Sequence, residues 1–530
     1  MSDLHSGGHR RGVVCAPHFA TVEAGRTILA EGGNAIEAMV AMAASIAAVY
    51  PHMNHLGGDG FWLIREPSGR VRAIMAAGPA GALVKPELYR DDETIPPRGP
   101  LAALTVPGAV GGWALALEAA RTHGGILPLD ILLAPAIAQA GNGYAVTRSQ
   151  ARLTQEHVAG LQGLPGFAAT FLPDGKPPAV GDLLKQTAFA ATLSHLAHSG
   201  LDDFYRGDIG REIAADLDRI QSPVTRLDLE RYRATLAEPL HVALPSGTVF
   251  NTDAPTQGVV SLMILSLFAR LNVTQAESFD HVHGLVEATK RALRVRDRSV
   301  TDPKYLAAPL ERFLADRFIA SEAAQIDRKK AAPWPAGGGA GDTIWMGAAD
   351  AGGLVVSYIQ SLYWEFGSGC VLPATGILMQ NRGASFSLQA GALNALAPGR
   401  VPFHTLNPAL TVLKDGRIMA YGCMGGDGQP QTQAALFTRA IDFREPLAEA
   451  LERPRWVLGR TWGAPRTALR LEPRFDDALI DALMAAGHDL DVLAEPYSDV
   501  MGHAGAVVLH PNGGLEGAHD PRADGGAAGA

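Results

Sequence analysis

The chain has 530 residues, of which 47% are hydrophobic and 19% charged, and it carries a formal net charge of −9 at pH 7. This much apolar sequence excludes an intrinsically disordered chain and predicts one large domain or two closely packed ones. The negative net charge and the scattered Lys and Arg residues argue against nucleic acid or an anionic membrane as a partner.

The cysteines and the N-terminus favour a soluble protein of the cytoplasm. Cys15, Cys370 and Cys423 form neither a CxxC pair nor a zinc motif, so we expect ordinary thiols in a reducing compartment, with no metal and no cofactor. Residues 1–11 contain no apolar segment of the kind that a signal peptide needs. The apolar run at 38–50 is too short to cross a bilayer and is expected to form a buried helix.

The first third of the chain is predicted to alternate helices with short buried strands, and mostly helical sequence follows it. Apolar residues recur at helical spacing, and glycine-rich turns separate the segments. The elements expected here are helices at 21–30 and 35–49, a strand at 61–64, mostly helical sequence at 111–217 and a helix at 281–295.

Residues 331–341 form the clearest break in this pattern. They are rich in Gly, Pro and Ala, so we expect a mobile loop that ends at Asp342-Thr343. An ordinary interdomain linker is the alternative explanation for the same pattern. Beyond the break we expect strands at 343–348, 354–359, 376–379, 409–413 and 419–421, helices at 431–440 and 475–486, and a Gly/Ala-rich tail.

A threonine that becomes the first residue of a chain carries its own base. Its hydroxyl is a weak nucleophile until a base takes the proton, and the α-amino group has a reference pKa of about 7.7–8.0. If the chain breaks before Thr343, that residue gains this chemistry. The glycines at Gly425 and Gly426 are candidate oxyanion donors, since glycine lets backbone N–H groups approach a reacting carbon closely. A simple turn between a strand and a helix is the alternative for this glycine pair, and both interpretations are compatible.

Several motifs in the right order resemble those of the γ-glutamyltranspeptidase family of N-terminal-nucleophile hydrolases. No single one is specific, but together they cover the chain nearly from end to end. They are GGNAIEA at 32–38, HLGGDGF at 55–61, TVPG at 105–108, PTQG at 255–258, EATK at 287–290 with Asp302-Pro303, FGSG at 366–369 and DPRADGGA at 520–527.

The resemblance implies an α+β fold, a four-layer αββα sandwich formed jointly by the two pieces of a self-cleaved proenzyme. The cut falls between Asp342 and Thr343, giving a large subunit 1–342 and a small subunit 343–530 that together make one structural domain. Thr343 is implied as the nucleophile, Ser361 as the hydroxyl that hydrogen-bonds it and assists maturation, and Gly425-Gly426 as the oxyanion hole. A dimer of such heterodimers is one assembly open to the protein.

The sequence departs from the transpeptidases where those enzymes hold the glutamyl group. Their Thr-Thr-His start becomes Thr343-Ile344-Trp345, and their carboxylate-binding Arg has no counterpart in 73–79. The other aligned changes place Tyr363 and Ser385 where they have an Asn and an Asp, His404-Thr405 for a Ser-Ser pair, and Arg382 for a Gln or Glu.

These changes predict a different substrate. Without the Asp, a substrate ammonium would be buried unpaired, whereas Arg382 adds a fork suited to a carboxylate. We therefore expect a compact acyl group bound by Tyr363, Arg382, His404 and Thr405, as in the oxamate amidohydrolase branch of the family. A glutaryl or cephalosporin acylase, a γ-glutamyl hydrolase or transferase, and an unprocessed pseudo-enzyme that binds a small carboxylate remain alternatives. Arg382 bonded to backbone carbonyls and His404 outside the substrate site are the structural alternatives for these two residues.

Overall fold

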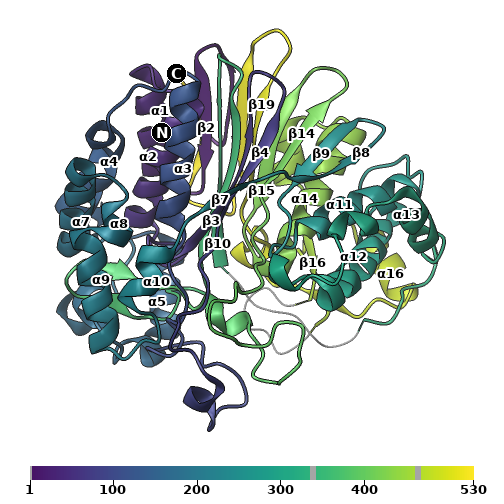
Figure 1. The fold of residues 1–530 in the computed structure, drawn as a ribbon. Helices are drawn as coiled ribbons and strands as arrows, with labels where there is room; N and C mark the ends of the chain where they lie inside the picture. Colours follow the sequence, from purple (N-terminus) through teal and green to yellow (C-terminus); the bar gives the residue numbers. More distant parts are fainter. Residues whose placement is uncertain (1–2, 335–341, 460–466) are drawn as a thin grey trace.

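The computed structural model describes residues 3–334, 342–459 and 467–530. Two seven-stranded sheets stack face to face, and helices cover the outer face of each sheet (Figure 1). The predicted α+β fold, a four-layer αββα sandwich, is therefore confirmed.

The sheet that carries Thr343 contains strands from both sides of residue 342. All its neighbouring strands are antiparallel. In spatial order it consists of β21 (Gly526–Gly529), β2 (Gly12–Ala16), β10 (Asp342–Asp350), β11 (Val355–Tyr363), β3 (Asp59–Arg65), β4 (Val71–Ala76) and β7 (Thr235–Ala237).

The second sheet is also antiparallel throughout and also mixes the two parts of the chain. Its order is β1 (His5–His9), β20 (Leu515–His519), β19 (Ala504–Leu509), β15 (Ile418–Cys423), β14 (Ala409–Leu413), β9 (Gly247–Asn251) and β8 (Leu240–Ala243).

Trp345 fills the space between the two sheets, two residues after Thr343. Its ring is buried, and its Nε1 donates a hydrogen bond to Ser357 Oγ on β11 at 2.9 Å. Glycines of the facing sheet make the room: a Cβ at Gly422 or Gly505 would lie 2.1 or 2.6 Å from the indole. Because dense packing of this kind resists displacement, the indole fixes the start of β10 against the opposite sheet.

The helix predicted from the apolar run at 38–50 is α2 (Ala35–Val49), and every residue in it is buried. It begins with a capping box, in which Asn34 and Glu37 satisfy each other's backbone N–H groups. Around it pack α1 (Phe19–Ala30), α3 (Ala109–Thr122) and α4 (Leu129–Asn142), on the outer face of the Thr343 sheet (Figure 1). α11 (Gly258–Ala269), α12 (Phe279–Ser299) and α14 (Gln429–Phe437) cover the second sheet.

The remaining elements are short or peripheral. The helices are α5 (Arg148–Leu161), α6 (Phe167–Phe171), α7 (Thr187–Ser199), α8 (Asp203–Arg206), α9 (Asp208–Arg219), α10 (Arg226–Arg231), α13 (Asp316–Ala323), α15 (Leu447–Glu452) and α16 (Asp477–Ala485). The strands are β5 (Tyr144–Ala145), β6 (Leu183–Leu184), β12 (Val371–Leu372), β13 (Ile377–Leu378), β16 (Trp456–Leu458), β17 (Leu469–Leu471) and β18 (Leu490–Val492).

The predicted elements exist, with three differences in the last third. The strand expected at 376–379 shrinks to the two residues of β13, and the helix expected at 431–440 ends as a π-helical turn at Thr438–Asp442. The Gly/Ala-rich tail, which carries no strand signal, forms β21 by pairing with the edge of β2, and Gly529 lets its backbone lie against His9. The predicted mobile loop falls largely on residues 335–341, which lie outside the described residues.

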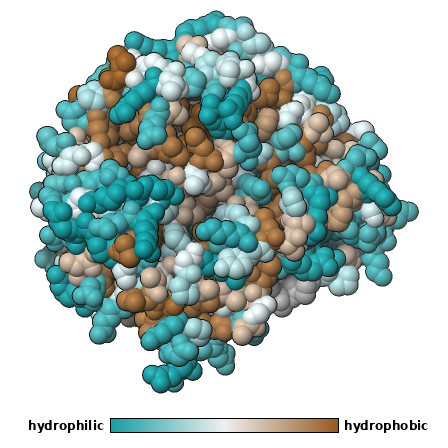
Figure 2. Space-filling model, viewed as in Figure 1, coloured by the Kyte–Doolittle hydropathy of each residue, from teal (hydrophilic) through white to brown (hydrophobic). Residues whose placement is uncertain are grey.

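Hydrophilic residues predominate at the edge of the face in Figure 2, and hydrophobic residues gather toward its centre. Across the described residues, no helix combines the length and apolar character needed to cross a bilayer. The apolar helix α2 lies inside the protein.

Candidate active site

Thr343 and Ser361 meet at a break in the register between β10 and β11. Asp342 pairs with Tyr363 but Ile344 with Gln360, so β11 has one extra residue opposite the buried Thr343. Such bulges re-aim side chains and recur beside active sites. Here the bulge brings the two hydroxyls together: Thr343 Oγ1 donates to Ser361 Oγ at 3.2 Å.

Two further groups orient these hydroxyls. Gln429 Nε2 donates to Thr343 Oγ1 at 3.4 Å, and the backbone N–H of Tyr363 donates to Ser361 Oγ at 2.7 Å. Gln429 is a residue that the sequence analysis missed, although it directly follows the glycine-rich stretch that ends at Gly428. Thr343 Oγ1 therefore has two polar partners, Ser361 on β11 and Gln429 on α14.

The predicted oxyanion residues lie in the turn between β15 and α14. Gly425 has φ 115° and Gly426 has φ 52°, conformations that side-chain-bearing residues rarely adopt. A Cβ at the neighbouring Gly502 would lie 2.3 Å from the carbonyl oxygen of Met424. The close approach requires glycine at 502, and the positive φ values favour glycine at 425 and 426.

A buried network holds this turn against the segment that carries Thr405. Gln257 Nε2 donates to the carbonyl oxygens of Gly426 at 2.9 Å and Thr405 at 2.7 Å. Its Oε1 accepts from Arg296 Nη1 at 2.9 Å, and Arg296 pairs with Asp427 at 2.6 Å. The PTQG motif at 255–258 thus acts structurally at the site, while Arg296 and Asp427 carried no sequence signal.

Arg382 lies in a short 3₁₀ helix (Arg382–Ser385) and is completely buried. Its Cζ lies 4.0 Å from the centre of the Tyr363 ring, and its Nη1 donates to Thr405 Oγ1 at a long 3.5 Å. Within the described residues, Nε and Nη2 have no hydrogen-bond partner. Burial lowers the pKa of Arg382 to about 10, so it stays charged at neutral pH.

An unpaired buried guanidinium is costly, so its environment indicates a negatively charged ligand. Since no backbone carbonyl in the described part of the chain accepts from Arg382, the alternative of an Arg bound to carbonyls finds no support. Tyr363 connects this cation to the nucleophile, because its ring lies under Arg382 and its N–H binds Ser361. Tyr363 has a φ of 86°, the kind of backbone strain that clusters at functional sites.

His404 is buried beside this cation but bonds to other groups. Its Nε2 lies 2.8 Å from Asp59 Oδ2, and its Nδ1 lies 2.8 Å from the carbonyl oxygen of Pro402. Asp59 comes from the HLGGDGF motif, where the sequence analysis assigned it no role. Ser385 Oγ donates to the carbonyl oxygen of Phe403 at 3.0 Å, so that hydroxyl is occupied by the backbone.

Other clusters of polar residues are structural. His283, Glu287 and His488 are close enough together to hold a metal ion. However, His283 bonds to His488 and to the carbonyl oxygen of Asp327, both at 2.8 Å, while Glu287 pairs with Lys290 at 2.7 Å. Both ring nitrogens of His283, Nε2 of His488 and one carboxylate oxygen of Glu287 thus take part in hydrogen bonds in this structure.

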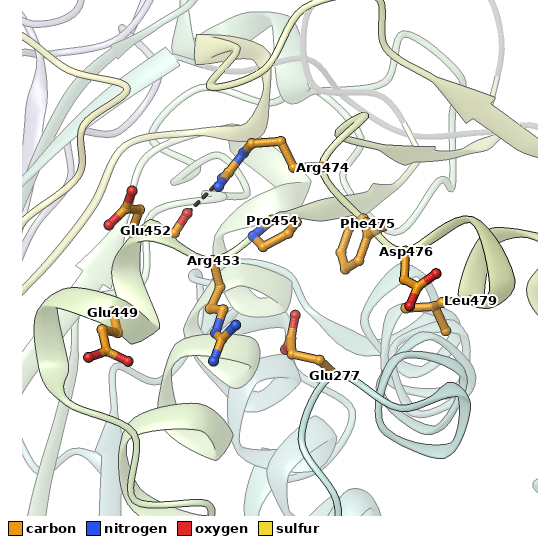
Figure 3. Close-up of a pocket in the computed structure, with 9 residues that line it drawn as sticks. All are labelled: Glu277, Glu449, Glu452, Arg453, Pro454, Arg474, Phe475, Asp476 and Leu479. Carbon is orange, nitrogen blue, oxygen red and sulfur yellow. Dashed lines mark hydrogen bonds between the residues drawn. The ribbon is translucent and has the colours of Figure 1, made fainter.

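A surface pocket of about 530 Å³ between Glu277, Arg453 and Arg474 contains none of the predicted site residues (Figure 3). Its charges are paired locally: Glu277 binds Arg439, Arg453 binds Glu445, and Arg474 donates to the carbonyl oxygen of Glu452. The pocket is thus rimmed by ion pairs that need no ligand.

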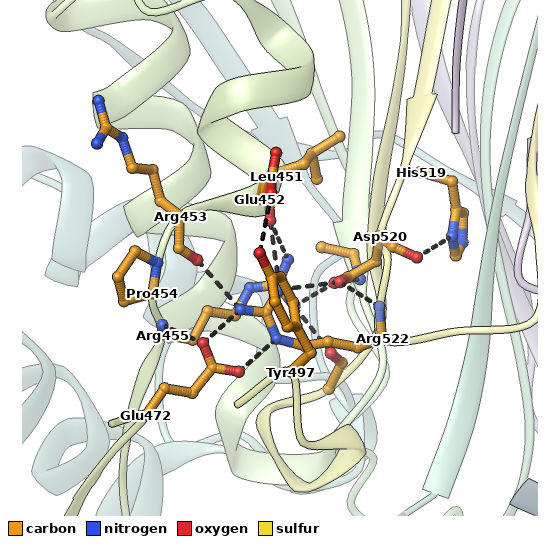
Figure 4. Close-up of polar contacts among 12 residues, drawn as sticks. Leu451, Glu452, Arg453, Pro454, Arg455, Glu472, Tyr497, His519, Asp520 and Arg522 are labelled. Atoms are coloured by element: carbon orange, nitrogen blue, oxygen red, sulfur yellow. Dashed lines mark hydrogen bonds and ion pairs between the residues drawn. The ribbon is translucent and has the colours of Figure 1, made fainter. Parts of the chain in front are cut away.

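Asp520 and Arg522 of the DPRADGGA motif belong to a buried network of ion pairs (Figure 4). Arg522 makes a bidentate pair with Glu472 at 2.7 and 2.6 Å and bonds Asp520 at 2.9 Å. Arg455 also pairs with Asp520 and donates to the carbonyl oxygen of Gly502 at 2.8 Å. The network therefore anchors the turn that packs against Met424 and the Gly425-Gly426 pair.

Comparison with known proteins decides the family. A family model described as gamma-glutamyltranspeptidase matches residues 21–530. The chain belongs to the γ-glutamyltranspeptidase family. It is accordingly an N-terminal-nucleophile enzyme that hydrolyses amides, as the sequence motifs predicted.

Among similar proteins is an oxamate amidohydrolase proenzyme from Klebsiella pneumoniae, 52% identical over 98% of both chains. A glutathione hydrolase-like proenzyme from Bacillus subtilis is 39% identical, also over 98% of both. A solved structure of cephalosporin acylase from Bacillus halodurans superimposes with a TM-score of 0.90 at 31% identity, covering 99% of this chain and 97% of its own.

Proposed function

We propose that this protein is a self-processing amidohydrolase that converts oxamate to oxalate and ammonia through an acyl-enzyme on Thr343. The observation that carries the proposal is the buried Arg382. Its unpartnered guanidinium nitrogens lie against the ring of Tyr363, and the backbone N–H of Tyr363 binds Ser361, the hydrogen-bond partner of Thr343. The 52% identity with a protein named as an oxamate amidohydrolase supports the same substrate.

Maturation comes first in this mechanism. Thr343 Oγ1 attacks the carbonyl carbon of Asp342, the C–N bond breaks, and the acyl group moves from nitrogen to oxygen. Water then hydrolyses this ester, which leaves a carboxylate on Asp342 and a free α-amine on Thr343. The products are subunits 1–342 and 343–530, which stay together as one domain because both sheets contain strands from each.

Turnover repeats the chemistry on the substrate. The Thr343 α-amine takes the hydroxyl proton, and Oγ1 attacks the amide carbon of oxamate. Backbone N–H groups of Gly425-Gly426 stabilise the oxyanion, and ammonia leaves with the proton that the amine took up. Water hydrolyses the oxalyl ester, releasing oxalate and restoring the hydroxyl. Ser361 and Gln429 orient Thr343 in both stages.

The site's charges favour a small carboxylate over a glutamyl group. Arg382 offers two donors for a carboxylate, in the bidentate geometry that Lys cannot reproduce. A γ-glutamyl substrate also carries an ammonium, which needs an anion. Asp59, the carboxylate whose charge acts on Arg382, is already bound to His404 and to the backbone N–H groups of Gly78 and Gly108.

Hydrolysis by the purified protein tests the proposal. Ammonia release is measured for oxamate, glutamine and a glutaryl amide, and aniline release for γ-glutamyl-anilide. We expect oxamate to be the preferred substrate and Thr343→Ala to be inactive. The glutaryl amide tests the second candidate, an acylase, which the 0.90 TM-score with cephalosporin acylase favours. A preference for the γ-glutamyl compound would contradict the oxamate assignment. The cytoplasmic location and the dimer of heterodimers stay predictions.

A further inference from the structure

Asp59, the first residue of β3, joins three segments around the proposed carboxylate site. Its Oδ1 accepts from the backbone N–H groups of Gly78 and Gly108, both at 3.0 Å, and its Oδ2 lies 2.8 Å from His404 Nε2. Both Asp59 and His404 have no exposed surface. The mechanism above gives Asp59 no part, yet its carboxylate is the most highly connected one in the site.

The protonation state of His404 decides which of its two hydrogen bonds can form. His404 Nδ1 faces the carbonyl oxygen of Pro402, which only accepts hydrogen bonds, and Nε2 faces the Asp59 carboxylate. A neutral imidazole has one N–H, so with Asp59 ionised it satisfies one of these contacts and leaves the other without a proton. Only the doubly protonated imidazolium satisfies both. The two hydrogen-bond acceptors around His404 therefore favour a second proton on its imidazole ring.

Arg382 opposes that second proton. The charged and titratable groups that face His404 are Asp59 from β3 and Arg382 from the 3₁₀ helix, with Tyr363 from β11 beneath the guanidinium. Burial and the charge of Arg382 lower the pKa of His404, whereas Asp59 and the Pro402 carbonyl raise it. A ligand anion on Arg382 would cancel the repulsion that comes from the guanidinium.

Charge balance leads to the same conclusion. In the free site, the charges of Arg382 and Asp59 offset each other, so an added carboxylate leaves the buried cluster with one net negative charge. Uptake of one proton by His404 makes this buried cluster neutral again. Neutrality matters there because an uncompensated charge costs more free energy in the protein interior than at the surface. Farther out, Arg296 and Asp427 neutralise each other by direct pairing.

We propose that Asp59 is a positioning residue that, through His404, makes the site take up one proton from solvent when it binds an anionic substrate. This inference rests on the proposed carboxylate site at Arg382. No covalent bond changes in the step: His404 goes from one N–H to two. Because the bound state holds the proton more tightly, affinity is highest at low pH and falls as pH rises through the pKa of His404 in the complex.

Calorimetry with oxalate as the probe tests the proposal on mature wild-type protein. Both oxalate carboxylates are ionised at neutral pH, so the probe itself contributes no proton. Titrations in two buffers with different ionisation enthalpies give the number of protons taken up. We expect close to one per oxalate at a pH between the pKa of His404 in the free protein and its pKa in the complex. Within that window affinity should fall up to tenfold per pH unit as pH rises.

Asp59→Asn separates the charge of Asp59 from its hydrogen bonds. The amide oxygen still accepts from Gly78 and Gly108, and the amide N–H₂ faces His404 Nε2, which fixes His404 as the neutral Nδ1–H tautomer. This variant should bind oxalate without proton uptake and with an affinity independent of pH. His404→Gln removes the titrating group altogether and should also abolish proton uptake. This second variant keeps the test valid if Asp59→Asn fails to fold.

Asp350→Asn is the matched control. This carboxylate is also buried and accepts from the N–H groups of Ala35 and Leu354 at 2.8 and 3.2 Å, but it lies at the opposite end of β10 from Thr343. It should keep the proton uptake. Two results would overturn this inference while leaving the proposed function intact. One is oxalate binding to wild type without proton uptake. The other is proton uptake that persists in Asp59→Asn, because that proton would then belong to the Thr343 amine. No oxalate binding at all contradicts the carboxylate site and with it the proposed function.

Discussion

Thr343 Oγ1 donates a hydrogen bond to Ser361 Oγ at 3.2 Å across the β10–β11 bulge. Ser361 in turn accepts from the N–H of Tyr363, so its hydroxyl is held in place rather than free to rotate away. The two hydroxyls come from neighbouring strands, and their contact depends on the one-residue break in register.

Ser361→Ala should slow both chain cleavage and amide turnover by about threefold to tenfold, since one hydrogen bond contributes about 0.5–1.5 kcal/mol. Gel densitometry over time and steady-state rates measure the two effects. Ser357→Ala is the control, because Ser357 lies buried on the same strand and bonds Trp345 instead. Unchanged kinetics in Ser361→Ala would reduce Ser361 to a packing residue.

Gln429→Leu should have a similar effect on turnover, because it removes the donor that reaches Thr343 Oγ1 from α14. The volume is nearly conserved, but the variant leaves the buried backbone N–H of Asn407 without the acceptor that Gln429 Oε1 provides at 3.2 Å, so the melting temperature should also fall. If kcat stays at the wild-type value for oxamate, Gln429 does not orient the nucleophile.

Substitution of Arg382 tests how the substrate is held. Arg382→Lys should raise KM for oxamate more than it lowers kcat, as expected when ground-state and transition-state binding are lost together. Arg382→Ala should reduce kcat/KM roughly tenfold to a hundredfold, since a charge-assisted hydrogen bond is worth about 1.5–3 kcal/mol. Arg439→Lys, at a buried Arg paired with Glu277 beside the outlying pocket, should leave KM unchanged. An equal KM in wild type and Arg382→Lys would remove Arg382 from the substrate site.

The packing of Trp345 predicts a stability effect. Gly422→Ala places a methyl group 2.1 Å from the indole in a core that cannot yield, and overpacking of this kind costs about 1–3 kcal/mol or more. Thermal denaturation should show a clearly lower Tm than for Gly160→Ala, where the helix α5 leaves open space and the change should be neutral or stabilising. Equal melting temperatures for the two variants would mean that the sheets separate easily at Trp345.

The sequence predicts the fold well because it depends on strong, local signals. Helical spacing located α2, and the Gly-rich break before Thr343 located the start of β10. The resemblance supplied Thr343 and Ser361, whose contact the structure contains.

What the sequence could not supply were partners brought together by the two sheets. Asp59 and His404 are 345 residues apart, and Gln429 meets Thr343 only because α14 begins beside β10. These contacts depend on the tertiary structure, so the spacing of the residues along the chain does not predict them. β21 was missed for the opposite reason: Gly and Ala carry little strand propensity, and the strand exists because β2 offers it an edge.

Intact-mass measurement of the purified, denatured protein tests the central claim most directly. The account predicts two polypeptides, residues 1–342 and 343–530, with Thr343 as the N-terminal residue of the smaller one, and a single 530-residue chain for Thr343→Ala. A wild-type protein that hydrolyses amides while remaining one uncut chain would contradict it.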